Sequence, residues 1–183
     1  VLKDFSFEIS KPGLYAIVGE NGSGKTTIFN LISKLYTNYD GEILINCNEI
    51  NDYKDEDLRN EVLFLESKPF ILRDNLTSNI TLLEKKKVDE SYLEKIIKNL
   101  DLRNVENHNR SNIKDTLSKG EQQKIQLARL LLKEYPLILL DECFSAFDEV
   151  TKKTVISELK KRSKNSIIII ISHDQEIIKR CDK

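Results

Sequence analysis

Hydrophobic and polar positions repeat with different periods along the chain, and each change of period marks a new element. Apolar and polar side chains alternate over residues 2–9, which predicts a half-buried strand. A short apolar run at residues 15–18 ends in a glycine, and residues 42–46 and 62–65 form two further candidate strands. Residues 25–35 carry apolar side chains three and four positions apart, so we expect an amphipathic helix there.

The middle of the chain has a different character. Residues 66–135 are rich in Lys, Asn and Glu, and contain helical patterns such as 91–100 and 122–134 but no clear strand. Beyond them, residues 137–140 and 167–171 are uninterrupted runs of Leu and Ile, as strands covered on both faces require. The pattern therefore predicts an α/β fold with a mainly parallel sheet, N-terminal antiparallel strands and an inserted α-helical subdomain.

Composition narrows the possible functions. The 183 residues suffice for one domain, and 29 Lys and Arg against 30 Asp and Glu leave a net charge of −1. No overall basic field attracts nucleic acid, so we expect no nucleic-acid partner. The longest strictly apolar run has five residues, far fewer than the ~20 that cross a bilayer. Three scattered cysteines indicate free thiols in a reducing compartment.

Both ends of the sequence suggest that it is part of a longer protein. The chain starts at Val1, contains no methionine and stops just after a helical pattern. We therefore expect it to be one domain, residues 1–183, excised from a longer protein.

A glycine-rich segment carries the first candidate chemistry. Residues 19–26 fit the phosphate-loop pattern G-x-x-x-x-G-K-[ST] between a predicted strand and a predicted helix. Glycines let several backbone N–H groups point at a phosphate, and the helix adds the positive end of its dipole. Lys25 supplies a charge for the β- and γ-phosphates, and Thr26 a hydroxyl for Mg²⁺. The nucleotide-contacting candidates are Gly19, Glu20, Asn21, Gly22, Ser23, Gly24, Lys25, Thr26 and Thr27.

Two further groups have both a functional and a purely structural interpretation. Ser118 and Glu121 form a capping-box pattern, which begins many helices without any function. The same pattern leaves N–H groups and a hydroxyl available to an anion. Asp141 and Glu142 end an apolar strand, where acidic pairs are often merely solvated. Beside a phosphate loop, a role in catalysis is the stronger interpretation.

Several motifs together resemble the ATP-binding domain of ABC transporters. The segment Leu117-Ser118-Lys119-Gly120-Glu121 resembles the family's signature motif, and residues 137–142 resemble its Walker B strand. Ser145-Ala146-Phe147-Asp148 resembles the D-loop, and Ser172-His173-Asp174 the switch histidine. The motifs stand in the family's usual order and cover nearly the whole chain.

The resemblance implies a role for each motif. Asp141 would support Mg²⁺, Glu142 would polarise the attacking water, and His173 would contact the γ-phosphate. Residues 1–65 and 136–183 would form a RecA-like core with a β subdomain, and residues 66–135 the helical signature subdomain. A second such domain would cover the ATP in a homo- or heterodimer, with contacts from Ser118, Lys119, Gly120, Glu121 and Asp148.

The sequence departs from the family pattern at three points. Lys119 and Glu121 replace a glycine and a glutamine of the signature, and Lys119 either adds a cation beside the phosphate or lies in solvent. Glu66 stands where the Q-loop glutamine is expected. A carboxylate there still ligates Mg²⁺, but it adds negative charge near the water and retunes hydrolysis. The aromatic residue that stacks on adenine would lie upstream of Val1, and His108 is assigned no role.

The type of transporter is inferred from one segment and the D-loop. Residues 70–80 resemble the segment of exporters that receives the membrane domain's coupling helix, and the D-loop sequence is also exporter-like. An exporter of peptides, lipids or drugs at the cytoplasmic face of the membrane is therefore the first hypothesis. A soluble ABC protein acting on ribosomes is the alternative, because these proteins often end their signature in Glu. A DNA-repair or chromosome ATPase is disfavoured, since no long coiled coil separates Asp141 from the phosphate loop.

Overall fold

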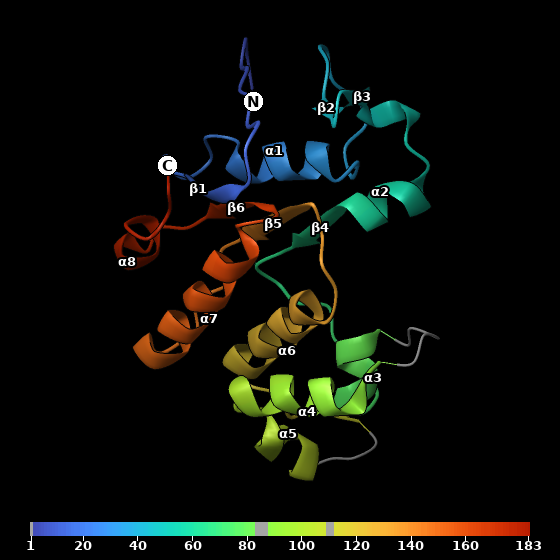
Figure 1. Cartoon of the computed structure of the whole chain (residues 1–183), viewed down its shortest axis with the longest axis vertical. Coiled ribbons are helices and arrows are strands. Elements are labelled where there is room, and N and C mark those ends of the chain that lie inside the picture. Colours follow the sequence, from blue (N-terminus) through green and yellow to red (C-terminus); the bar gives the residue numbers. More distant parts are fainter. Residues whose placement is uncertain (1, 83–87, 109–111) are drawn as a thin grey trace. The chain divides into compact units, whose positions relative to one another are not determined.

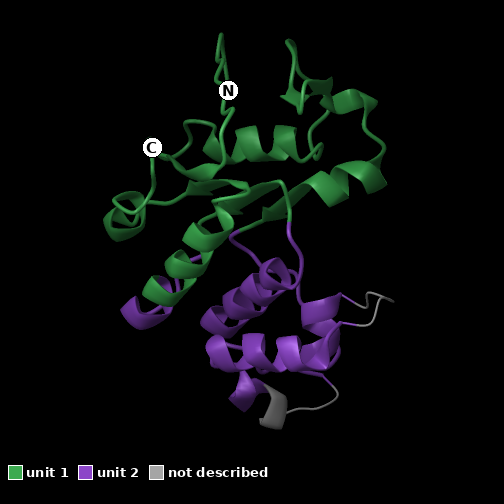
Figure 2. Cartoon of the chain, viewed as in Figure 1, with its two compact units in different colours: residues 1–66, 135–142, 153–183 green, residues 67–134, 143–152 purple. Residues whose placement is uncertain are grey.

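The computed structural model describes residues 2–82, 88–108 and 112–183, and these divide into two compact units (Figure 2). Unit 1 contains residues 1–66, 135–142 and 153–183, and unit 2 contains residues 67–134 and 143–152. Residues 143–152 belong to unit 2 by their contacts. The chain thus passes from unit 1 into unit 2 directly after Glu142.

A four-stranded parallel sheet organises unit 1 (Figure 1). Its strand order is β1-β6-β5-β4. The strands are β1 (Gly13–Ile17), β4 (Val62–Leu65), β5 (Leu137–Asp141) and β6 (Ile167–Ile171). The two central strands are the uninterrupted Leu and Ile runs, and four of the five residues in each are buried. The predicted α/β class and parallel sheet are confirmed.

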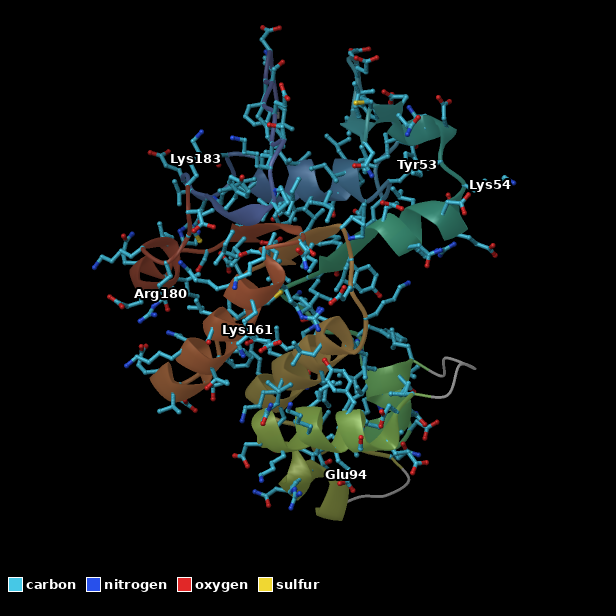
Figure 3. The ribbon with its side chains drawn as sticks, viewed as in Figure 1. Tyr53, Lys54, Glu94, Lys161, Arg180 and Lys183 are labelled. Atoms are coloured by element: carbon cyan, nitrogen blue, oxygen red, sulfur yellow. The ribbon has the colours of Figure 1, made fainter. Side chains whose placement is uncertain are left out.

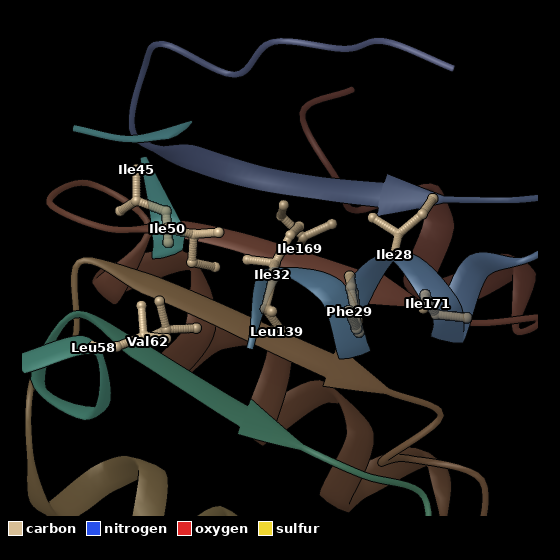
Figure 4. Packing of buried hydrophobic residues seen from close by; sticks show 10 residues of the cluster. All are labelled: Ile28, Phe29, Ile32, Ile45, Ile50, Leu58, Val62, Leu139, Ile169 and Ile171. Atoms are coloured by element: carbon tan, nitrogen blue, oxygen red, sulfur yellow. The ribbon is translucent and has the colours of Figure 1, made fainter. Parts of the chain in front are cut away.

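Helix α1 (Lys25–Ile32) covers one face of this sheet (Figure 4). Its apolar residues Ile28, Phe29 and Ile32 pack against Leu139 and Ile169 of the central strands. Each such side chain contributes about 1.5–3 kcal/mol when it leaves water. The packing fixes α1, and hence the loop that precedes it, at the carboxyl end of the sheet.

The antiparallel part of unit 1 is smaller than predicted. Strands β2 (Leu44–Ile45) and β3 (Asn48–Glu49) form a hairpin, so the predicted strand 42–46 is only two residues long. Asn46 and Cys47 between them have φ of 51° and 63°, the left-handed pair of a type I′ turn, so β2 ends before them. Unit 1 also contains the 3₁₀ turn Ile50–Asp52, helices α2 (Asp55–Glu61) and α8 (Gln175–Ile178), and residues 153–162 of α7 (Glu149–Arg162).

The prediction of a strand at residues 2–9 is wrong. This segment has no strand hydrogen bonding, and Asp4 adopts a left-handed φ of 47° that interrupts an extended run. Phe5 and Phe7 are 52% and 48% exposed and lie against each other, with ring centroids 5.5 Å apart. Alternation alone does not form a strand when the ladder lacks a paired neighbour.

Unit 2 contains helices and no strand among its described residues. Its helices are α3 (Leu76–Thr81), α4 (Glu90–Asn99), α5 (Arg103–His108), α6 (Lys119–Leu132) and the first turn of α7 (Glu149–Arg162), which continues into unit 1. Three of these helices have a side-chain N-cap. Asn75, Asp89 and Ser118 accept hydrogen bonds from backbone N–H groups in the first turns of α3, α4 and α6, respectively. The side chain of His108 lies outside the described residues.

The described surface is strongly charged, and side chains such as Lys54 and Arg180 project away from the ribbon (Figure 3). No helix among residues 2–82, 88–108 and 112–183 has the length and apolar character to cross a membrane.

Candidate functional site

The carboxyl edge of the parallel sheet gathers the candidate residues of unit 1. Ile17 of β1 and Asp141 of β5 both pair with Ile171 of β6, so the loops that leave these three strands start side by side. On β4, Leu65 pairs with Leu140, which places Glu66 next to the position of Asp141. Ligands of open parallel sheets bind at this edge.

The glycine loop after β1 is shaped for a phosphate. Gly22 and Gly24 have φ of 80° and 96°, values that other residues resist. A Cβ at Gly19 would lie 3.1 Å from the Ser23 hydroxyl oxygen, so the loop also closes tightly at its start. Gly24 is the N-cap of α1 and has no side chain to cap it. The first N–H groups of α1 therefore face the loop, as an anion site requires.

Lys25 lies along this loop. Its ammonium donates hydrogen bonds to the Gly19 carbonyl oxygen at 2.8 Å and to the Glu20 carbonyl oxygen at 2.7 Å. These contacts hold the positive charge at the concave side of the loop, where it would meet a bound phosphate.

Thr26 and Asp141 form the centre of the site. The Thr26 hydroxyl donates a hydrogen bond to Asp141 Oδ2 at 2.7 Å. Burial raises the pKa of Asp141 above its usual range, and the nearby Glu142 adds to the rise. The Thr26 hydrogen bond and Lys25 oppose it. A hydroxyl and a carboxylate at hydrogen-bond distance are the oxygen ligands that Mg²⁺ uses beside substrate phosphates, so the residues fit this ion.

Glu142 has an unusual backbone. Its φ of 49° is left-handed, and its N–H donates to the Ile171 carbonyl oxygen at 3.0 Å. Non-glycine residues with such dihedrals often mark functional sites. The strain turns the chain at the end of β5, and Glu142 Oε1 then lies 3.4 Å from His173 Nε2. Both side chains are about half exposed, at 42% and 52%.

The candidates of unit 2 lie around the start of α6. Ser118 is the N-cap of this helix, and the capping box with Glu121 is present in full. A Cβ at Gly120 would lie 3.3 Å from the Ala146 carbonyl oxygen, a distance that most side chains avoid. Glycine therefore lets the helix start approach residues 145–146. Ser118 and Lys119 are exposed.

Gln123 is a functional candidate that the sequence analysis missed. Its side chain is fully buried, donates to Ser145 Oγ at 3.2 Å and accepts from the Ala146 N–H at 3.1 Å. It thereby ties residues 145–146 to α6. The one signal in the sequence was a glutamine among the apolar positions of a helix.

Asp148 begins α7. Its carboxylate accepts hydrogen bonds from the Thr151 N–H at 2.8 Å and the Thr151 hydroxyl at 3.2 Å. These bonds, the backbone one first, lower the pKa of Asp148. The structure thus brings the predicted residues together in two groups, one at the sheet edge of unit 1 and one at the start of α6 in unit 2. Their roles toward ATP remain predictions.

The sequence and the fold of this chain are both similar to those of ABC transporters. The ABC transporter family model matches residues 2–145. The chain is 30% identical to the microcin-J25 export ATP-binding/permease protein of Escherichia coli and 31% identical to the ATP-dependent lipid A-core flippase of Pasteurella multocida. All of the chain aligns with 32% of each relative. Its fold matches a bacterial Atm1-family ABC exporter with ATP bound at a TM-score of 0.86 and 25% identity, over 96% of this chain and 32% of that one.

Proposed function

The chain belongs to the ABC transporter family, and we propose that it is the domain that binds and hydrolyses ATP to power an exporter. It spans 32% of the length of the curated relatives, so the activity of the whole protein is part of this proposal. Its support is the meeting of a glycine loop, a lysine, a threonine and a carboxylate at one sheet edge.

ATP would bind with its phosphates in the loop of residues 19–26. Lys25 would neutralise the β- and γ-phosphates, and the N–H groups at the start of α1 would hold their oxygens. Thr26 and Asp141 would hold Mg²⁺, with Glu66 as a further ligand. A Mg²⁺ ion held by these side chains would supply positive charge that offsets the negative charge developing in phosphoryl transfer.

Hydrolysis would depend on residues at the ends of β5 and β6. Glu142 would accept the proton of the attacking water, because its carboxylate directly follows Asp141 at the end of β5. His173 would contact the γ-phosphate, and its 3.4 Å approach to Glu142 lets it orient that carboxylate. Positioning and electrostatics would supply most of the rate.

A second ABC ATPase domain would complete the site. The start of α6, with Ser118, Lys119 and Gly120, would cover ATP held by the partner, and Asp148 would contact it across the interface. Glu121 belongs to the same group. ATP would then join the two domains, and hydrolysis would release them.

The relatives are an export protein and a lipid flippase, which favours export over the ribosomal alternative. We infer membrane domains as partners, a position at the cytoplasmic face of the membrane, and a peptide, lipid or drug-like cargo. Phe70, 64% exposed in the segment before α3, would contact the coupling helix of the membrane domain.

The Thr26–Asp141 hydrogen bond beside Lys25 is the observation that carries this proposal. Calorimetry of Mg·ATP binding tests it. Lys25→Ala should weaken binding by about 10- to 100-fold, because it removes charged hydrogen bonds. Lys11→Ala, at an exposed lysine before β1, is the matched control and should leave affinity unchanged. Equal affinity of Lys25→Ala and the parent would refute the site.

A further inference from the structure

The hydroxyl of Ser118 is hydrogen-bonded within its own helix turn, and its single proton is already donated. It donates a hydrogen bond to Glu121 Oε2 at 2.7 Å and accepts one from the Glu121 N–H at 3.2 Å. The Ser118 N–H donates to the same carboxylate oxygen at 2.8 Å. A phosphate approaching the start of α6 therefore meets a serine whose proton already points at a carboxylate.

We propose that Glu121 is a positioning residue. It restrains the Ser118 side chain and thereby lowers the affinity of the start of α6 for the nucleotide bound by the partner chain. This inference rests on the proposed function, in which Ser118 covers ATP bound by a second copy. Its basis is the pair of hydrogen bonds that converge on one oxygen of Glu121.

Two physical effects act in the same direction. The Ser118 hydroxyl must leave a charge-assisted hydrogen bond before it donates to a phosphate oxygen, and such bonds are about twice as strong as neutral ones. The carboxylate also places a negative charge within the first turn of the helix, where the positive end of the dipole would otherwise favour an anion.

Other charges around the helix start set the background for this effect. Lys119 stands next to Ser118 and is exposed, and Lys124 lies close enough to Asp148 to lower the pKa of that carboxyl. These lysines attract a phosphate, whereas Glu121 repels it. Glu121 is the acidic group bonded to the serine that would contact the nucleotide.

Glutamine at this position separates charge from capping. Its amide oxygen accepts the same two hydrogen bonds, from the Ser118 N–H and hydroxyl, so the helix keeps its start. The amide carries no charge, and its NH₂ group adds a donor. Glu121→Gln therefore tests the proposal without removing the cap.

Sedimentation velocity of the full chain with Mg·ATP measures the effect, in a Glu142→Gln background that prevents turnover. Adding Glu121→Gln should lower the dimer dissociation constant about tenfold at low salt, because a like charge near the phosphates is removed. The gain should shrink as salt rises, since the interaction is screened. Glu94→Gln, on the exposed side of α4, is the matched control and should change nothing.

A double-mutant cycle tests whether Glu121 acts through the serine. The benefit of Glu121→Gln should be at least halved in Ser118→Ala, where no hydroxyl is left to release. Mg·ATP affinity of the monomer, read by calorimetry, should stay constant and confirms that the variants are folded. A dimer of equal or weaker affinity in Glu121→Gln would overturn the inference alone. The absence of any ATP-dependent dimer in the Glu142→Gln parent would overturn the inference and the proposed function together.

Discussion

The hydroxyl of Thr26 donates a hydrogen bond to Asp141 Oδ2 at 2.7 Å and so joins two segments 115 residues apart in the sequence. Thr26 lies in the first turn of α1, and Asp141 is the last residue of β5. The packing of α1 on the central strands holds them together. The pair of oxygens is therefore preorganised, and this lowers the cost of binding a cation.

Removal of the Thr26 hydroxyl should weaken the magnesium-dependent part of ATP binding. We expect Thr26→Ala to lower Mg·ATP affinity about tenfold, because one oxygen and the orientation of Asp141 are lost together. Calorimetry in magnesium and in EDTA separates the two parts, and the EDTA value should be unchanged. Thr77→Ala, at an exposed threonine of α3, is the control. Equal losses with and without magnesium would contradict an ion site here.

The raised pKa of Asp141 makes stability depend on pH. A carboxyl whose pKa is higher in the folded state than its ordinary 3.8 favours folding when protonated, and that contribution is lost as pH rises through the raised value. Asp141→Asn should thus match the parent below pH 3.8 and become the more stable protein as pH rises toward 7. Thermal melts without magnesium measure this difference. A difference that does not grow with pH would show that Asp141 is not destabilised by ionisation.

The left-handed backbone of Glu142 should lower the free energy of unfolding for any residue other than glycine at this position. We expect Glu142→Gly to be about 1 kcal/mol more stable than Glu142→Ala, because glycine adopts a φ of 49° without strain. Urea unfolding measures the difference. Both variants should lose ATP hydrolysis, since both lack the carboxylate. If the alanine variant were the more stable one, the backbone at this position would not be strained.

The buried side chain of Gln123 should matter for the structure around residues 145–146. Gln123→Ala removes two hydrogen bonds, to the Ala146 N–H and to the Ser145 hydroxyl, at a combined cost of about 1–3 kcal/mol. Ser145→Ala removes one of the two bonds and should cost less. Urea unfolding of the two variants checks the order. An equal cost would mean that the bond to the Ala146 N–H contributes nothing.

The charge of Glu66 should affect turnover. Glu66→Gln removes a negative charge beside the proposed position of the attacking water, and we expect about a threefold rise in ATP hydrolysis at saturating magnesium. Steady-state phosphate release measures it. Glu61→Gln, at the end of α2, serves as the control for charge removal in unit 1. Equal rates across magnesium concentrations would make the substitution at Glu66 silent.

The sequence predicted the centre of the fold better than its edges. The Leu and Ile runs of β5 and β6 are covered on both faces, so their burial shows in the sequence itself. The segment 2–9 has the alternation of a strand, but alternation does not reveal whether a neighbouring strand exists to pair with it.

Within the candidate site, sequence motifs identified the residues whose arrangement depends only on their near neighbours in the chain. The glycine loop and the acidic pair were readable because their spacing along the chain fixes their geometry. Gln123 was missed because its partners lie 22 and 23 residues away and depend on how the helix packs. The engagement of the Ser118 hydroxyl by Glu121 was visible only as a cap, since spacing does not show which oxygen receives the proton.

The pairing of β5 with β6 also limits how this chain can evolve. Asp141 and Ile171 are register partners, and they fix where Glu142 and His173 leave the sheet. Exchanges among isoleucine, valine and leucine within β6 keep that register and cost little. Insertion or deletion of one residue there would send alternate side chains to the opposite face and carry His173 away from Glu142. Drift in this strand should therefore exchange one aliphatic side chain for another but hardly change the length of the strand.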